Sequence, residues 1–347
     1  MAILWPVFIP YKRSLKIKGM QHKEILLEVH RLCKTFSVSH HLLGHTIGKV
    51  SALHNVSFTL YKGETLGLVG ESGCGKTTLG RTILRLLEPT SGRIIFDGVD
   101  ITHCSARQMR SMRKKMQIIF QDPYAALNPR MAIHQILAEP IQIHHMADGK
   151  AASTKRIYQL LDYVQLPSTV LYKYPHELSG GQRQRICIAR ALAVEPTFIV
   201  CDEAIAALDV SVQAQVINLL MDLQKELGLT YLFISHDLRV VEFIADQVAV
   251  MYLGKIVEAA PAAEIYKNPT HPYTKALFSA IPTMHPSKSK ERIILQGDVP
   301  SPRNLPTGCC FHPRCWKAAE KCSHIQPELD KMEKENHQVA CHFPEID

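Results

Sequence analysis

The chain has 347 residues, of which 46% are hydrophobic and 21% charged, and these values are ordinary for a globular protein. They exclude a disordered chain, a collagen and a coiled coil, and the length suits two modest domains or one larger domain with an attachment. Forty Lys and Arg against 32 Asp and Glu give a net charge of +8, which fits an anionic ligand, a lipid surface or nucleic acid. No stretch reaches the roughly 18 apolar residues of a membrane span, so we expect no crossing.

The N-terminus is apolar over residues 1–10 and basic over residues 12–18. A secretory signal has the opposite order, with the charge before the apolar core. We interpret residues 1–19 as an upstream extension or a mis-assigned start, with an interfacial anchor as the less favoured alternative. The first domain is expected to span residues 20–262.

The predicted elements follow in chain order. We expect strands at 25–29, 56–61, 65–69, 93–96, 116–120, 197–201, 230–234 and 247–251, helices at 77–87, 211–227 and 238–246, and a loop at 37–49. Strands that alternate with helices predict an α/β fold, with a largely parallel sheet covered on both faces. A helical stretch at about 124–190 is predicted to be an insertion. Recurrent prolines after residue 260 predict a loop-rich extension over 263–347.

The turn after the 65–69 strand has the phosphate-binding pattern G-x-x-x-x-G-K-[ST]. Its residues are Gly70, Glu71, Ser72, Gly73, Cys74, Gly75, Lys76 and Thr77. Glycines let successive N–H groups turn inward, and the helix that follows adds its positive N-terminus. Lys76 would meet the outer phosphates, and Thr77 would offer a hydroxyl to Mg²⁺. This segment predicts a nucleoside triphosphate site.

Two acids end a buried strand at residues 197–201, where ligands of parallel sheets bind. Asp202 would hold Mg²⁺, and Glu203 would polarise the attacking water as a general base. Gln121 follows another strand and could touch Mg²⁺ or water. His236 follows the 230–234 strand and could donate to the γ-phosphate.

Leu178 precedes Ser179, Gly180, Gly181 and Gln182, which open a helix. A helix of about 13 residues is roughly 20 Å long, so its N-terminus would point away from the Mg²⁺ edge. A second anion-binding helix start makes sense if it meets the γ-phosphate of another subunit. The spacing therefore predicts a dimer with nucleotide in the interface.

With these motifs the chain, over about residues 25–260, resembles the nucleotide-binding subunits of ABC transporters. The resemblance implies a P-loop core with an antiparallel β subdomain and a helical signature subdomain. The resemblance also implies that the phosphate loop extends to Thr78 and that Asp209 is the D-loop acid. Phe36 is the candidate for the aromatic residue that stacks on adenine. The family usually has Pro and Ser where this chain has Ala204 and Ala206. The lost hydroxyl puts inter-site coupling in doubt and leaves hydrolysis intact.

The segments 120–129, 208–215 and 268–277 resemble ATPases of oligopeptide, dipeptide and nickel importers. That resemblance implies import of di- or oligopeptides, with nickel and antimicrobial peptides as alternative cargo. It implies a paralogous ATPase partner or a homodimer, two membrane permeases and, indirectly, a solute-binding protein. The expected place is the cytoplasmic face of the inner membrane, as a peripheral subunit.

Cysteines gather in the last 39 residues, at Cys309, Cys310, Cys315, Cys322 and Cys341. Four thiolates suit Zn²⁺ or a [4Fe–4S] cluster, and the family resemblance favours iron–sulfur through all but Cys310. Scattered reduced thiols are the plain alternative.

Two further classes are weighed against the importer. A soluble ABC ATPase of DNA repair or translation would need a long coiled-coil insert or a second ATPase unit, and the chain shows neither pattern. A metal or redox sensor would need a reactive, exposed cluster. The basic surface is expected to serve phosphate and membrane contacts, with no nucleic acid bound.

Overall fold

The computed structural model describes residues 23–39, 46–281, 292–332 and 336–345. The prediction for residues 1–19 lies outside these ranges. In the described ranges, no helix is long and apolar enough to cross a membrane.

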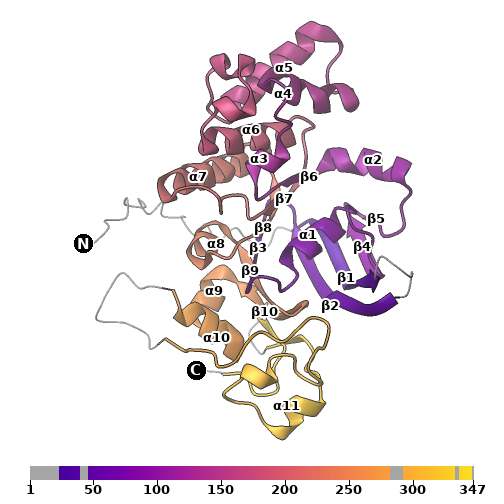
Figure 1. Ribbon diagram of the computed structural model, residues 1–347, viewed down its shortest axis with the longest axis vertical. Coiled ribbons are helices and arrows are strands. Elements are labelled where there is room, and N and C mark those ends of the chain that lie inside the picture. The colour runs from indigo at the N-terminus through magenta and orange to yellow at the C-terminus, as the bar shows by residue number, and fades with distance from the viewer. Residues whose placement is uncertain (1–22, 40–45, 282–291, 333–335, 346–347) are drawn as a thin grey trace, which may run out of the picture.

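The larger sheet has the strand order β11-β12-β10-β9-β3-β8-β7-β6. The part from β10 to β6 is labelled in Figure 1. Its parallel part consists of β3 (Thr65–Val69), β6 (Met116–Ile119), β7 (Phe198–Asp202), β8 (Thr230–Ile234) and β9 (Gln247–Tyr252). β10 (Lys255–Pro261), β11 (Asp330–Lys331) and β12 (Gln338–Val339) add to it in antiparallel fashion. The expected parallel sheet is confirmed, and an antiparallel edge that the sequence did not predict extends it.

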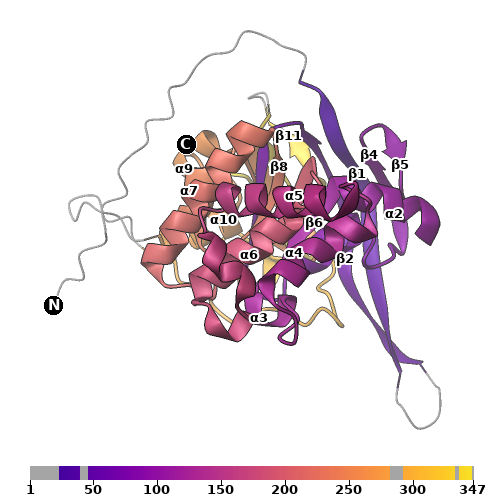
Figure 2. The ribbon, with the colours of Figure 1, turned by 90° about the horizontal axis from the view of Figure 1, so that it is seen from above.

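The smaller sheet is antiparallel, in the order β2-β1-β4-β5. Its strands are β1 (Ile25–Ser39), β2 (Thr46–Tyr61), β4 (Ser91–Phe96) and β5 (Val99–Asp100). β1 and β2 pair from Ile25 opposite Tyr61 to Ser39 opposite Thr46, and they form a long hairpin that extends from the body (Figure 2). The predicted loop at 37–49 is therefore wrong where it is described. The residues there lack the alternation of apolar and polar side chains that marks a strand in the sequence, and the two strands are held together by backbone hydrogen bonds.

Helices cover the larger sheet and form the insertion at the top of Figure 1. The insertion contains α3 (Pro123–Ala126), α4 (Ile133–Ile143), α5 (Gly149–Tyr163) and α6 (Gly180–Leu192), with short 3₁₀ turns at Ser168–Tyr172 and Pro175–Glu177. The remaining helices are α1 (Lys76–Ile83), α2 (Ala106–Lys115), α7 (Val210–Leu227), α8 (Leu238–Ile244), α9 (Ala262–Lys267), α10 (Pro272–Ser279) and α11 (Glu320–His324). A further 3₁₀ turn spans His312–Arg314.

Alternate residues of the central strands face two different cores. Phe198 and Val200 of β7 pack with the antiparallel sheet and α1, whereas Ile199 and Cys201 pack with the helices on the other face. Every residue of β7 is buried. A strand that is covered on both faces reads as a continuous apolar run, which is why the sequence predicted it.

The extension is attached to the sheet by a buried carboxylate. Glu258 of β10 accepts hydrogen bonds from the Thr270 amide at 2.7 Å and hydroxyl at 2.8 Å, and from the His271 amide at 2.9 Å. Its Oε1 also lies 2.8 Å from Nε2 of His337, which precedes β12. These contacts fix the start of α10 and the tail to one strand. The domain boundary near residue 262 remains a prediction, since the tail shares the sheet.

Candidate nucleotide-binding site

The phosphate loop joins β3 to α1, as the sequence predicted. Gly70 has φ +153° and Gly75 has φ +107°, a left-handed conformation that ends at the first turn of α1. A Cβ at Gly70 would lie 2.2 Å from the Met251 carbonyl oxygen, and one at Gly75 would lie 2.5 Å from that of Ala52. Both positions therefore require glycine, for close approach of backbone and for backbone conformation.

Lys76 is folded back on the loop that precedes it. Its ammonium donates to the carbonyl oxygens of Gly70 at 2.8 Å and Glu71 at 3.0 Å, and it lies 3.8 Å from the Cys74 sulfur. Only 5% of Lys76 is exposed. A buried ammonium held by loop carbonyls is a cation available to a phosphate group that enters the loop.

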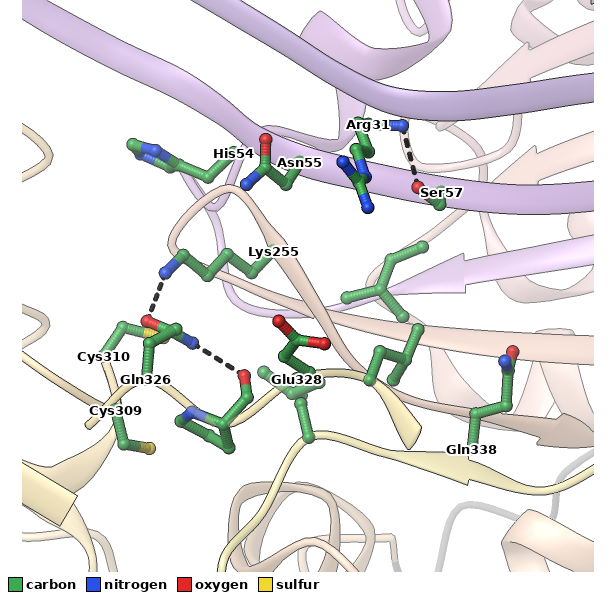
Figure 3. Close-up of a pocket in the computed structure, with 15 residues that line it drawn as sticks. Arg31, His54, Asn55, Ser57, Lys255, Cys309, Cys310, Gln326, Glu328 and Gln338 are labelled. Atoms are coloured by element: carbon green, nitrogen blue, oxygen red, sulfur yellow. Dashed lines mark hydrogen bonds between the residues drawn. The ribbon is translucent and has the colours of Figure 1, made fainter. Parts of the chain in front are cut away.

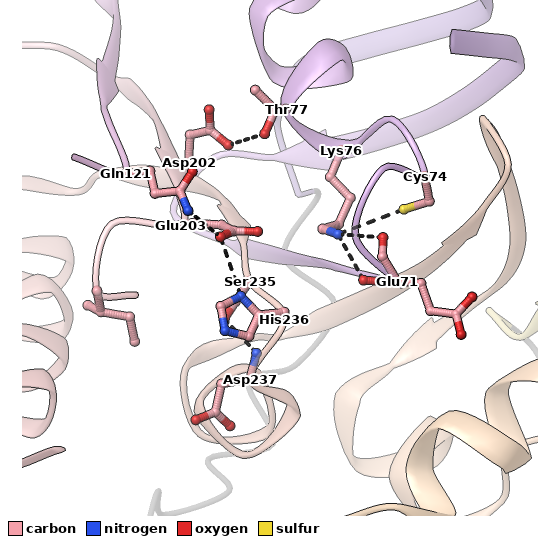
Figure 4. Close-up of polar contacts among 12 residues, drawn as sticks. Glu71, Cys74, Lys76, Thr77, Gln121, Asp202, Glu203, Ser235, His236 and Asp237 are labelled. Atoms are coloured by element: carbon pink, nitrogen blue, oxygen red, sulfur yellow. Dashed lines mark hydrogen bonds and ion pairs between the residues drawn. The ribbon is translucent and has the colours of Figure 1, made fainter. Parts of the chain in front are cut away.

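Asp202 at the end of β7 meets the start of α1 (Figure 4). The Thr77 hydroxyl donates to Asp202 Oδ1 at 2.7 Å, and Arg81 Nη2 lies 3.9 Å from Oδ2. Burial raises the pKa of Asp202, and the hydrogen bond from Thr77 opposes that shift. The hydroxyl and carboxylate oxygens that the sequence assigned to Mg²⁺ are thus adjacent, and hard oxygen donors of this kind fit the ion.

Three of the predicted catalytic side chains meet at one carboxylate oxygen. Gln121 Nε2 donates to Glu203 Oε2 at 2.9 Å, and His236 Nδ1 lies 3.3 Å from the same oxygen. Glu203 has φ +50°, a left-handed conformation that a non-glycine residue rarely adopts. Its amide donates to the Ile234 carbonyl at 3.0 Å, so the neighbouring strand holds this backbone. A strained backbone conformation whose cost is offset by surrounding contacts is typical of functional positions.

The signature segment begins α6. The Ser179 hydroxyl accepts from the Gln182 amide at 3.3 Å, and Gln182 Oε1 accepts from the Ser179 amide at 3.1 Å. This capping box leaves the helix N-terminus fixed and accessible. A Cβ at Gly181 would lie 2.5 Å from a methyl group of Val212 in α7. The signature glycine therefore permits close packing of α6 on α7.

Asp209 caps α7, accepting from the Val212 amide at 3.0 Å and the Ser211 hydroxyl at 2.7 Å. The Ser211 hydroxyl is the main cause that lowers the pKa of Asp209. Phe36 is 37% exposed on β1, and the Lys34 ammonium lies 4.9 Å from its ring centre. Within the described residues, no side-chain hydrogen bond joins Ser179 or Asp209 to the Gln121–Glu203–His236 group. The roles assigned to these two residues and to Phe36 remain predictions.

The four cysteines assigned to a metal line one small cavity, together with Phe311 and three histidines, His271, His312 and His342. Burial raises the pKa of the thiols of Cys309 and Cys315, and that of Cys341 to about 11. Over the residues that the structure describes, no three His, Cys, Asp or Glu side chains are arranged to hold a metal ion. The predicted donors are gathered, but a preformed coordination geometry is not observed there.

A larger cavity of about 650 Å³ lies between the antiparallel sheet and the extension (Figure 3). Arg31 and His54 come from the sheet side, and Lys255 and Glu328 face them. Cys309 and Cys310 also line it, but no phosphate-loop residue does. This cavity is separate from the nucleotide site.

Sequence reasoning missed three side chains that contact the predicted site. Arg81 lies near Asp202, while Tyr273 and Arg314 of the extension contact Glu71 of the phosphate loop. Arg81 stands one helical turn after Thr77, a spacing that could have revealed it. Tyr273 and Arg314 are 202 and 243 positions from Glu71, and no local pattern connects residues so far apart.

Comparisons with known proteins show similarity along most of the chain. The family model described as ABC transporter matches residues 53–206, and that described as oligopeptide/dipeptide transporter, C-terminal region, matches residues 257–322. The oligopeptide transport ATP-binding protein AppF of Bacillus subtilis is 50% identical over 325 residues, covering 93% of this chain and 98% of its own. A Brucella ovis protein named for peptide import ATP binding is 55% identical over 289 residues, covering 83% of this chain and 90% of its own.

Solved structures show the same fold. The chain is similar to cbiO1 of Clostridium perfringens, part of the ABC transporter complex cbiONQ, with a TM-score of 0.61 and 28% identity over 71% of this chain and 92% of that one. A dimeric ATP-binding cassette in a post-hydrolysis state, bound to ADP and phosphate, gives a TM-score of 0.61 and 27% identity over 68% of this chain and 99% of that one. The expected fold class is confirmed.

Proposed function

Because the chain belongs to the ABC transporter ATP-binding subunits, ATPases that couple hydrolysis to transport, we propose that it powers the import of di- or oligopeptides. The observation that carries the proposal is the match to AppF, which spans 98% of that oligopeptide transport protein. The match of residues 257–322 to the oligopeptide/dipeptide transporter C-terminal region supports the same cargo. Nickel and antimicrobial peptides are the alternative cargo.

In the proposed engine, the phosphate loop binds ATP through its backbone amides, and Lys76 turns from its carbonyl partners to the outer phosphates. Thr77, Asp202 and Gln121 would hold Mg²⁺, which neutralises phosphate charge when bound. Phe36 would stack on adenine. The oxygen of Thr77 is already 2.7 Å from Asp202, which supports this assignment of ligands.

Glu203 would accept the proton of the attacking water. Gln121 Nε2 and His236 Nδ1 both contact its Oε2, at 2.9 and 3.3 Å. Both contacts would have to yield or rearrange when water and the γ-phosphate enter. His236 would then donate to the γ-phosphate, and Gln121 would report the nucleotide state to the helical insertion.

The composite site would form between two ATPase subunits. The N-terminus of α6, with Ser179, Gly180 and Gly181, would contact the γ-phosphate bound by the partner, and Asp209 would cross to the partner's site. The similarity to a dimeric cassette supports this assembly. The partner would be a paralogous ATPase or a second copy. Two membrane permeases would bind near Gln121 at the cytoplasmic face of the membrane, and a solute-binding protein would deliver cargo to them.

The cysteine cluster would be a structural metal centre, and an iron–sulfur cluster is proposed ahead of zinc. The support is chemical: Cys309, Cys315, Cys322 and Cys341 surround one cavity, and four thiols suit either metal. Metal ligation requires thiolates, and burial raises the pKa of the Cys309, Cys315 and Cys341 thiols, so protons would be released when metal binds. Cys315→Ser should lose the bound metal, whereas Cys104→Ser, at a partly buried cysteine outside the cluster, should not. Iron, zinc and sulfide contents that are unchanged in Cys315→Ser would contradict the centre.

Uptake of labelled peptides tests the cargo. Cells that carry Glu203→Gln should lose uptake of di- or oligopeptides, and the dependence on peptide length would identify the class. Glu195→Gln, at an exposed carboxylate that pairs with Arg156 at 3.0 Å, is the matched control. Normal peptide uptake in cells whose Glu203→Gln protein is expressed and has lost ATP hydrolysis would reject the peptide cargo and leave the ATPase assignment standing.

A further inference from the structure

Glu71 of the phosphate loop is held by two side chains of the C-terminal extension. Arg314 donates from Nη1 to Glu71 Oε2 at 2.8 Å and from Nη2 to Oε1 at 3.2 Å, a two-pronged pair. The Glu71 amide donates to the Tyr273 hydroxyl at 2.9 Å. A bidentate guanidinium–carboxylate pair fixes orientation as well as charge. The extension therefore holds both the backbone and the side chain of one phosphate-loop residue.

The pair is sheltered from solvent. The side chain of Arg314 is 8% exposed and that of Glu71 is 28% exposed. Glu71 raises the pKa of the guanidinium through their hydrogen bonds, so Arg314 stays charged. Removing one partner of a sheltered pair leaves the other charge uncompensated. Without Arg314, the Glu71 carboxylate would place an unbalanced negative charge in the loop that binds a triphosphate.

Glu71 also determines where the phosphate-binding lysine rests. Its carbonyl oxygen accepts from Lys76 Nζ at 3.0 Å, beside the Gly70 carbonyl at 2.8 Å. One residue thus contacts the ATP-binding cation through its carbonyl and the extension through its amide and carboxylate. A shift of Glu71 would move the carbonyl partner of Lys76.

Arg314 lies between Cys309 and Cys315, in a segment whose position is fixed by a buried aromatic side chain. Phe311 is 1% exposed, and its ring centre lies 5.3 Å from that of Tyr252 in β9 and 5.4 Å from that of Tyr273 in α10. The Arg314 amide donates to the Phe311 carbonyl at 3.0 Å. Buried aromatic contacts of this kind resist small displacements. Changes in the 309–315 segment should therefore reach Arg314.

We propose that Arg314 is a positioning residue of the nucleotide site, by which the extension neutralises and holds Glu71 so that the loop accepts phosphate. It acts through Glu71. Because linkage is reciprocal, bound nucleotide stabilises the 309–315 segment by as much as that segment supports nucleotide binding. The proposal concerns ATP binding, and it depends neither on the transported cargo nor on a metal in the cysteine cluster.

Equilibrium binding of a magnesium complex of a non-hydrolysable ATP analogue tests the charge argument. Arg314→Met, which keeps an apolar stem and loses the charge, should bind about tenfold more weakly, within the range of typical coupling between sites. Glu71→Gln serves as the reference for a phosphate loop that lacks the carboxylate. The double variant should recover to within about threefold of Glu71→Gln, because the repelling carboxylate is gone.

That recovery separates positioning from damage to the fold, since a second substitution does not repair a misfolded chain. Lys317→Met is the matched control. Lys317 is a cation of the same region, and its ammonium lies 3.2 Å from the Glu345 carboxylate, so its loss should leave the affinity for nucleotide at the wild-type value. Arg314→Lys should lie between wild type and Arg314→Met, because the charge stays and the fork is lost. Wild-type affinity in Arg314→Met, or a double variant as weak as Arg314→Met, would overturn the proposal.

Amide hydrogen exchange tests the reciprocal arm without using activity. In the wild-type protein, the same nucleotide complex should slow exchange in the peptide that covers residues 309–315. In Arg314→Met the nucleotide, at a concentration that saturates the variant, should leave that peptide unchanged. Equal exchange with and without nucleotide in the wild type would overturn the linkage.

Discussion

The ATP-binding core and the C-terminal extension hold their important residues by different means. In the core, each predicted catalytic side chain follows a parallel strand, and the backbone ladder places them together: Gln121 after β6, Asp202 and Glu203 at the end of β7, His236 after β8. In the extension, β11 and β12 have two residues each. There, side-chain contacts across the boundary make the long-range connections, such as those of Thr270 with Glu258 of β10 and of Arg314 with Glu71. Regular backbone pairing can be read from a sequence, whereas a network of side chains distant in sequence cannot.

The largest expected effect lies in the core. Glu203→Gln should lower ATP hydrolysis by about 10² to 10⁴-fold, the usual contribution of a general base, while nucleotide binding is kept. The amide still accepts one hydrogen bond at the position that Gln121 and His236 now contact, but it cannot take a proton. Steady-state phosphate release checks the rate, and Glu195→Gln serves as its matched control. Turnover within about threefold of the wild type would show that another group is the base.

The second effect concerns the attachment of the extension. Glu258 is fully buried and accepts hydrogen bonds from Thr270 and His271 beside His337. Glu258→Ala should lower the free energy of unfolding by about 3 kcal/mol, because several buried polar groups lose their partner. Urea unfolding measures it, and Glu328→Ala, at an exposed carboxylate, should change it by less than about 0.5 kcal/mol. Equal stability of the two variants would mean that Glu258 does not anchor the extension.

The same contrast explains what the sequence could predict. The phosphate loop, the acids at the end of β7 and the capped start of α6 are local patterns, and the structure brings Thr77 to Asp202 and Gln121 to Glu203. The outer part of the β1–β2 hairpin, where a loop was predicted at 37–49, was missed because these residues lack the apolar alternation that marks a strand. The Arg314–Glu71 pair was missed because its partners are 243 positions apart. The chemistry of each residue was readable, but its partner was not.

A pH dependence is the third expected effect, and it belongs to the extension. Burial lowers the pKa of His271 to about 4 from 6.5, while Glu258 acts in the opposite direction. Between these values the unfolded chain binds a proton that the folded chain excludes, so stability falls as the pH drops and is unaffected above about 6.5. The total loss is about 3 kcal/mol.

His271→Asn isolates this contribution. The His271 ring accepts from the Tyr273 amide at 3.0 Å, and the Asn side chain can accept the same bond as a helix N-cap without titrating. Urea unfolding from pH 7.5 to pH 4.5 should give a shallower loss of stability in the variant than in the wild type. Identical slopes would assign the pH dependence to other groups.

The smallest expected effect provides a reference for the pair of Arg314 with Glu71 of the phosphate loop. Arg93 and Asp100 form another arginine–carboxylate pair, at 3.2 Å, but their side chains are 64% and 48% exposed. Water screens such a pair and the long side chain loses entropy in making it, so Arg93→Met should cost less than about 0.5 kcal/mol and leave nucleotide affinity unchanged. Arg314→Met removes the same group from a side chain that is 8% exposed and should weaken nucleotide binding. If both variants bound nucleotide equally well, burial next to the phosphate loop would not be what makes the Arg314 pair matter.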